Sequence, residues 1–339
     1  MTTDSAKSNS ETKRLPSQRL TDVDIAKGLA IILVVFGHIV ARQPPAENGW
    51  YLVVKEAIYG FHMAFFMFLS GIVFFMKVRI VKSWKDYKDE LWKRFIRLMP
   101  AYLLFAGAVF LAKWGAQSFL YVDNPVNGWT DFVNILLFPT ESISAFLWYI
   151  YVLFLFSTVG ISLIPLTRGA VLPLVGLGLI LLFVTQTPFL GMDQFCKYFL
   201  FFALGGLAIR HWEKYNTLVY WTWIPAMVVF IVMLVTGQYR GDGWIPTALL
   251  SLIALHGLCK QQIPFTNILS FLGLMSFPIY LMNTLSIGFV KALMLKFISW
   301  DGTNFLLFSP ILTIAGLFIP VLVKQHLIRR VDWLNKITS

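Results

Sequence analysis

The sequence has 339 residues, of which 58% are hydrophobic and only 13% charged, and its formal net charge is +11. Because soluble domains are about half apolar and a quarter charged, this composition predicts an all-α integral membrane protein and excludes a separate soluble catalytic domain. Two cysteines are too few for a disulfide scaffold or a cysteine-built metal site, and we expect no bound metal.

Residues 1–20 are rich in Ser, Thr and Lys and poor in large apolar side chains, which predicts a disordered tail. The rest of the chain contains ten apolar runs that approach the roughly 20 residues needed to cross a membrane. They cover residues 25–41, 57–77, 99–114, 144–165, 170–188, 196–209, 218–236, 244–259, 266–289 and 304–324. We therefore predict about ten transmembrane helices in one domain over 21–330, followed by a second tail over 331–339.

The first apolar run has an alternative interpretation. It follows Lys13, Arg14 and Arg19, as does the apolar region of a cleaved signal peptide. The sequence HIVARQPP at its end is a poor small-residue cleavage site, so we favour a first span that is retained.

The segment 78–98 lies between the second and third spans and differs from both in composition. Its sequence, VRIVKSWKDYKDELWKRFIRL, is charged, and its apolar residues recur near helical spacing. This pattern predicts an amphipathic helix lying on a membrane surface, with membrane lipid as its partner.

The distribution of lysine and arginine predicts the orientation of the chain. With the N-terminus in the cytoplasm, 21 of these residues fall on the inner side and seven on the outer side. Cytoplasmic loops carry this excess, so we expect a multi-pass membrane protein with both termini in the cytoplasm. The positive net charge then reflects topology and attraction to anionic lipid, and we expect no nucleic-acid partner.

Three ionisable residues lie in the first span, where their cost in free energy makes them functional candidates. At 100° per residue, His38 is offset by only about 20° from Lys27 and about 40° from Asp24, so the three share one stripe of the helix. His38 lies roughly 16 Å further along the axis than Lys27. The stripe therefore connects the inner side of the membrane, at Asp24 and Lys27, with the outer side.

His62, in GFHMAFFMFLSG, enters the second span near its outer end. His38 and His62 share a depth if the first two spans form an antiparallel hairpin. Asn283, in SFPIYLMNTLS, lies at a similar depth in the ninth span. A single histidine in a span is often a hydrogen-bonded packing residue, but two at matched depth favour a site for base or nucleophile chemistry.

Arg94 and Arg97 are three residues apart on the amphipathic segment and share one face of its helix. Two neighbouring guanidinium groups suit phosphate recognition. Anchoring to lipid headgroups is the alternative, and the spacing alone favours it.

These motifs, taken together, resemble the type 3 membrane acyltransferases. The run RLTDVDIAKGLAIILVVFGH at 19–38 is similar to the opening signature of that family. FHMAFFMFLSG at 61–71, the arginine pair before Pro100, LWYIYVLF at 147–154 and SFLGLMSFPIYLMN at 270–283 are similar to later motifs of the family, in the same order. The chain looks closest to fucose 4-O-acetyltransferase-like members that modify bacterial surface or secreted glycans.

The resemblance implies that residues 21–330 form one membrane acyltransferase domain. It implies cytoplasmic acetyl-coenzyme A as donor and co-substrate, no bound cofactor, and a hydroxyl of a glycan or lipid-linked sugar as acceptor. His38 is then the catalytic base or nucleophile, with His62 orienting it or serving the leaving thiolate. Two features depart from the family pattern: Asn283 stands where many members have His, and Lys27 replaces the commoner Arg.

The other site residues follow from this hypothesis. Arg94 and Arg97 bind the phosphates of the donor, with Lys27 and Arg19 nearby. Asp24 pairs with Lys27, and Asn283 has an orienting role. Trp148 and Tyr149 enter the fourth span at the outer depth and contact the acceptor sugar, unless they are interfacial anchors.

A transporter or flippase for a glycan or lipid-linked sugar remains the alternative function. It explains ten spans and intramembrane His and Lys equally well, but it does not explain an arginine pair on a surface helix.

Overall fold

The computed structural model describes residues 20–40, 44–79, 81–120, 122, 124–184, 187–261 and 263–338. Within these ranges the ordered elements are helices, and no β-strand occurs. This confirms the predicted all-α fold. The predicted tail at 1–20 lies outside the described residues except for Leu20.

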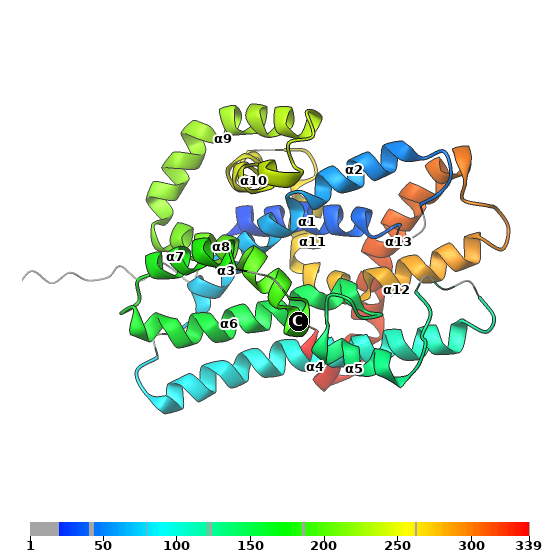
Figure 1. The fold of residues 1–339 in the computed structure, drawn as a ribbon, viewed down its shortest axis with the longest axis horizontal. Helices are drawn as coiled ribbons and strands as arrows, with labels where there is room; N and C mark the ends of the chain where they lie inside the picture. The colour runs from blue at the N-terminus through cyan, green and yellow to red at the C-terminus, as the bar shows by residue number, and fades with distance from the viewer. Residues whose placement is uncertain are drawn as a thin grey trace, which may run out of the picture.

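The helices follow one another along the chain with short connections. They are α1 (Thr21–Gly37), α2 (Gly49–Tyr59), α3 (His62–Lys77), α4 (Trp84–Ala116), α5 (Trp129–Leu137), α6 (Trp148–Leu166), α7 (Leu172–Leu181), α8 (Met192–Arg210), α9 (Trp212–Val235), α10 (Trp244–Cys259), α11 (Thr266–Leu274), α12 (Ser276–Met294), α13 (Phe305–His326) and α14 (Asp332–Ile337). In Figure 1, α1 crosses the centre of the molecule, with α4 and α6 below it and α9 and α10 above.

Eight helical segments within the described residues are long and apolar enough to cross a membrane. They correspond to eight of the ten predicted spans. The other two predicted spans are represented by α1, of 17 residues, and α7, of 10 residues. The chain is therefore a multi-pass membrane protein. Much of α9 is apolar and exposed, as expected of a surface that faces lipid.

The predicted surface segment is helical, but it is not a separate helix. It starts at Trp84 and continues through the third span as the 33-residue α4. A capping box fixes its start: Asp86 N–H donates to Ser83 Oγ at 3.1 Å, and Ser83 N–H donates to Asp86 Oδ2 at 3.0 Å. The boundary expected near Pro100 is absent because the helix accommodates the proline in its interior.

Two predicted spans contain breaks that their apolar composition conceals. The second begins earlier than expected, as α2, and turns at Phe61, whose φ of −144° and ψ of −28° are not helical. The ninth breaks at Met275 between α11 and α12. Pro278 follows this break, and since proline has no N–H to donate to the preceding turn, the interruption there costs little.

Glycines bring two helix pairs into backbone contact. A Cβ atom on Gly28 of α1 would lie 1.9 Å from the carbonyl oxygen of Leu269 on α11, and one on Gly273 of α11 would lie 1.8 Å from that of Asp24. A Cβ on Gly205 of α8 would lie 2.1 Å from the carbonyl oxygen of Phe68 on α3. Close approach through small residues is the usual way in which membrane helices pack.

The predicted tail at 331–339 forms α14 over most of its length, and α14 packs against α4. The Nζ of Lys324 on α13 donates to Thr338 Oγ1 at 2.7 Å and to the carbonyl oxygen of Asn335 at 3.0 Å. These bonds tie the end of the described chain to α13.

Candidate active site

Helix α1 carries the candidate residues of both ends of the site. Lys27 lies in its second turn and forms an ion pair with Asp24 at 3.6 Å. His38 is the residue that follows the last turn, with a helical φ of −90° and ψ of −5°. At about 1.5 Å rise per residue the two side chains start roughly 16 Å apart along the axis. We call these two regions the Lys27 end and the His38 end.

The imidazole of His38 is held by the side chain of Asn283 on α12. Nδ1 of His38 lies 2.9 Å from Oδ1 of Asn283. The amide nitrogen of Asn283 donates to the carbonyl oxygens of Ile279 at 3.0 Å and Tyr280 at 2.8 Å, which fixes the amide so that its oxygen faces the histidine. An amide oxygen only accepts, so His38 donates through Nδ1 and its Nε2 carries the free lone pair.

The second histidine, His62, has the same tautomer for a similar reason. Its Nδ1 donates to the carbonyl oxygen of Ile58 at 2.8 Å, because a carbonyl can only accept. His62 is 4% exposed and within electrostatic range of His38. The ring of Tyr59 lies 4.9 Å from that of His62, and its hydroxyl donates to the carbonyl oxygen of Gly37 at 2.9 Å. Two imidazoles with free Nε2 atoms therefore lie at one end of α1.

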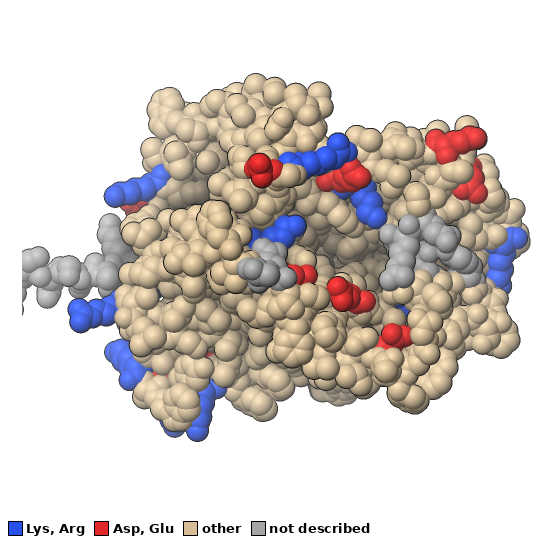
Figure 2. Space-filling view, in the orientation of Figure 1, with Lys and Arg blue, Asp and Glu red and all other residues tan. Residues whose placement is uncertain are grey.

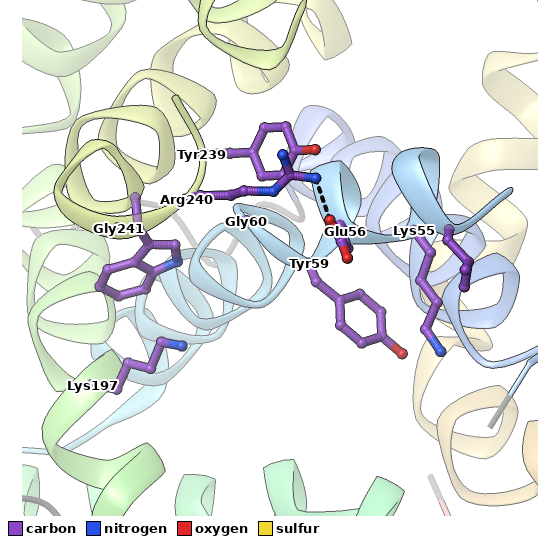
Figure 3. A pocket seen from close by; sticks show the side chains of 10 residues that line it. Lys55, Glu56, Tyr59, Gly60, Lys197, Tyr239, Arg240 and Gly241 are labelled. Carbon is purple, nitrogen blue, oxygen red and sulfur yellow. Dashed lines mark hydrogen bonds and ion pairs between the residues drawn. The ribbon is translucent and has the colours of Figure 1, made fainter. Parts of the chain in front are cut away.

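A cavity of about 750 Å³ lies next to Tyr59, the residue that contacts the His62 ring. Its wall is made by Leu52, Lys55, Glu56, Tyr59, Gly60, Lys197, Tyr239, Arg240, Gly241 and Trp244. Figure 3 shows Lys55 and Lys197 reaching into one space from opposite sides, with Tyr59 between them. The surface is hollowed near its centre, with charged side chains on the rim, in Figure 2.

Positive side chains gather at the Lys27 end. Lys77, at the end of α3, is within electrostatic range of Arg94 and Arg97 on α4, and Lys27 is within range of Lys77 and Arg97. We call these four residues the cationic cluster. The side chain of Arg97, which is exposed, makes no hydrogen bond or ion pair to another residue in the described part of the chain.

Arg94 is more enclosed than Arg97. Its guanidinium lies 5.0 Å from the centre of the Phe74 ring, and its Nε is buried and has no hydrogen-bond partner among the described residues. Arg19, which the sequence also predicts at this end, lies outside the described residues.

Lys77 is a member of the cationic cluster that the sequence did not predict. In the sequence it is one of many charged residues that follow a span, and only the packing of α3 beside α1 and α4 brings it to this end.

Trp148 and Tyr149 have different surroundings although they are adjacent in sequence. Trp148 stacks on Tyr198 at 5.5 Å. Tyr149 is buried, its hydroxyl lies 2.6 Å from Ser70 Oγ in the middle of α3, and it is within electrostatic range of Arg97. Tyr149 thus lies at a depth between the two histidines and the cationic cluster.

A second polar network at the Lys27 end was also missed by sequence reasoning. Asp22 forms an ion pair with Lys260, and its Oδ2 lies 3.4 Å from Nε2 of the fully buried His256. Nδ1 of His256 lies 2.7 Å from the hydroxyl of Tyr215. The network joins α1 to α9 and α10.

The family model for the acyltransferase domain, type 3, matches residues 20–324. Because the match covers most of the chain, the protein belongs to this family of acyltransferases, as the motifs predicted. No curated protein and no solved structure matches the chain. The matched range runs from the residue before α1 into the last turn of α13, so it contains both ends of the candidate site.

Proposed function

We propose that this membrane acyltransferase transfers an acetyl group from acetyl-coenzyme A to a hydroxyl of a sugar in a glycan or lipid-linked precursor. The observation that carries the proposal is the position of two imidazoles with free Nε2 atoms, His38 and His62, at the opposite end of α1 from the cationic cluster. This arrangement separates a place for a phosphate-bearing donor from a place for chemistry.

The cationic cluster is the proposed contact for the phosphates of coenzyme A. Its four cations, Lys27, Lys77, Arg94 and Arg97, outnumber the neighbouring carboxylates of Asp24 and Glu90. Arginine suits phosphate groups because its planar guanidinium donates two parallel hydrogen bonds. The sequence prediction that includes Arg19 in this site stays a prediction.

The pantetheine arm of the donor is the proposed bridge between the two ends. The phosphates are too polar to enter hydrocarbon, whereas the arm is thin and flexible. The arm would run from the cationic cluster, past the buried Tyr149, toward His38. It would thereby place the thioester at the His38 end, across the roughly 16 Å between the two ends of the site. Tyr149 and Ser70 are the polar groups at intermediate depth.

His38 is the proposed general base. Its Nε2 accepts the proton of the acceptor hydroxyl while the hydroxyl oxygen attacks the thioester carbonyl. The new ester bond forms as the carbon–sulfur bond breaks, and the thiolate of coenzyme A leaves with the electron pair. Asn283 accepts the hydrogen bond from Nδ1 and stabilises the imidazolium that forms. The His38 imidazolium then gives this proton to the leaving thiolate, which restores the neutral base, and His62 is the proposed orienting residue beside it.

The proposed setting is a bacterial cytoplasmic membrane with both termini and the Lys27 end in the cytoplasm. The excess of lysine and arginine on that side supports it. The acceptor then reacts at the outer side, beside the cavity and Trp148, whose indole offers a face for a sugar ring.

The experiment is transfer of label from acetyl-coenzyme A in membranes that contain the protein. Label in the acetyl group should appear in the glycan fraction, whereas label in the adenine of the same donor should not. The His38→Ala variant, present at the same level, is the matched control. A transporter or flippase would change the location of glycans and leave them without label.

A further inference from the structure

The cavity at the His38 end contains more positive than negative charge. Its wall carries Lys55, Lys197 and Arg240, against the single carboxylate of Glu56. Arg240 and Glu56 pair with each other, as the dashed line in Figure 3 shows. Among the described residues, neither Lys55 nor Lys197 forms an ion pair, although Asp193 is within electrostatic range of Lys197.

Contacts with a backbone carbonyl and with aromatic rings hold these two lysines in place. The Nζ of Lys55 donates to the carbonyl oxygen of Val40 at 2.5 Å and lies 5.3 Å from the centre of the Tyr59 ring. The Nζ of Lys197 lies 4.7 Å from the ring of Trp244 and 5.5 Å from that of Tyr198. Ring faces orient an ammonium group, but they add no negative charge.

Three residues of the cavity wall lie near the reacting groups. Lys55 donates a hydrogen bond to the carbonyl oxygen of Val40, two residues after His38, and is within electrostatic range of His38. Lys197 is within electrostatic range of His62. Tyr59 forms part of the cavity wall and contacts the His62 ring. Lys55 and Tyr59 therefore connect the cavity wall with the two histidines, which do not themselves line it.

We propose that the acceptor carries an acidic group, a carboxylate or a phosphate ester, and that Lys55 and Lys197 bind it while aromatic side chains hold the sugar. This inference rests on the proposed function, in which the acceptor is a sugar at this end. Tyr59, which is 40% exposed, and Trp244 supply aromatic side chains in the wall beside which a sugar ring can lie, and the two ammonium groups supply the charge. A neutral glycan would leave both ammonium groups in the cavity wall without an ion-pair partner.

Two kinds of acceptor would place an anion next to a sugar ring, and they differ in where the anion comes from. A carboxylate belongs to the sugar itself, as in a uronic acid, whereas a phosphate ester joins the sugar to a lipid or to its neighbour. Both accept charge-assisted hydrogen bonds from an ammonium group. The test therefore uses one probe of each kind.

The experiment measures direct binding to the purified full chain in lipid nanodiscs by isothermal titration calorimetry. The probes are tetragalacturonate, farnesyl phosphate and, as the neutral match for the first, galactotetraose. We expect at least one acidic probe to bind ten- to a hundredfold more tightly than galactotetraose. Binding of tetragalacturonate assigns the carboxylate, and binding of farnesyl phosphate assigns the phosphate.

Variants connect this binding to the two lysines. Lys55→Gln and Lys197→Gln should each weaken binding of the acidic probe about tenfold or more and leave galactotetraose unaffected. Lys197→Arg should retain binding because it keeps the charge, and Lys296→Gln, an exposed lysine outside the cavity wall, is the matched control. Thermal unfolding of each variant shows whether it is folded. If the Gln variants are unfolded, Lys197→Arg, which keeps the positive charge, remains as a test of the role of that charge.

Three results would overturn the inference: equal binding of galactotetraose and both acidic probes, no binding of either acidic probe at millimolar concentration, or acidic binding that Lys55→Gln and Lys197→Gln leave unchanged. None of these requires acetyl transfer. Transfer of label to a neutral acceptor would support the proposed function and contradict this inference. Binding of an acidic probe without any acetyl transfer would support this inference and contradict the proposed function.

Discussion

His38 and Asn283 face each other across the contact between α1 and α12, with Nδ1 of the histidine 2.9 Å from Oδ1 of the asparagine. Asn283 is fully buried and its amide nitrogen is bonded to two backbone carbonyls. The asparagine therefore accepts from His38 in one orientation only. One side chain decides which ring nitrogen of the other carries the proton.

Replacement of His38 by Ala should abolish acetyl transfer without preventing membrane insertion. Loss of a general base reduces the rate about 10²–10⁴-fold, and one imidazole contributes little to integration of the chain. The measurement is the initial rate of label transfer, normalised to the amount of protein in the membrane. Retention of more than about a tenth of the rate would remove His38 from the proposed role.

Asn283→Leu should lower kcat about a hundredfold, the cost of a misplaced reacting group, and leave KM for acetyl-coenzyme A nearly unchanged. The leucine has a similar volume but cannot accept from Nδ1. Asn283→His, which restores an acceptor, should recover most of kcat. If both variants lose activity together with thermal stability, Asn283 serves packing and does not position His38.

Arg97→Ala and Lys77→Ala should raise KM for acetyl-coenzyme A about tenfold or more, since a hydrogen bond to a charged group contributes about 1.5–3 kcal/mol. KM for the acceptor should change less. Lys85→Ala is the matched control, because Lys85 is exposed on the same helix and lies outside the cationic cluster. Reduced expression with unchanged donor saturation would favour lipid anchoring.

Gly205→Leu should prevent correct assembly of the protein. Its side chain would meet the backbone of α3, where even a Cβ would lie 2.1 Å from the carbonyl oxygen of Phe68. Gly107→Leu is the control, because a Cβ at Gly107 has no neighbour within 4 Å. The measurement is the yield of monodisperse protein after extraction in mild detergent, and equal yields would contradict the packing described for α3 and α8.

Labelling of single cysteines tests the sidedness of α1. In a variant without Cys196 and Cys259, Ala46→Cys, on an exposed position beyond His38, should react with a membrane-impermeant thiol reagent added to intact spheroplasts. Lys85→Cys, on the exposed start of α4, should react only after the membrane is opened. Reversed reactivities would exchange the donor and acceptor sides.

The sequence predicted the all-α membrane fold and the family because apolar runs and spaced motifs are local signals. The pairing of Asp24 with Lys27 is likewise local, since the two are one turn apart on one helix. The break at Met275 was missed because the apolar pattern continues through it. Length and hydropathy report that a segment is apolar, and they do not report where its helix is interrupted.

The remaining parts of the candidate site depend on contacts between distant segments. Lys77 belongs to the cationic cluster only because α3 packs beside α1 and near α4. Tyr59 and Lys197 meet in one cavity although 138 positions separate them in the sequence. No spacing rule connects such residues, so a single sequence cannot bring them together.

The backbone contact of α1 with α11 through Gly28 and Gly273 has a consequence for the choice of donor. There is no space between these helices in which α1 could slide or rotate without displacing main-chain atoms. The rise of α1 itself sets the separation of Lys27 and His38, and the contact with α11 keeps both residues in place relative to the neighbouring helix. A phosphate-anchored donor delivers its acyl group only if its own arm matches that length, so carriers with a shorter arm should be rejected by distance alone, however well their head groups bind.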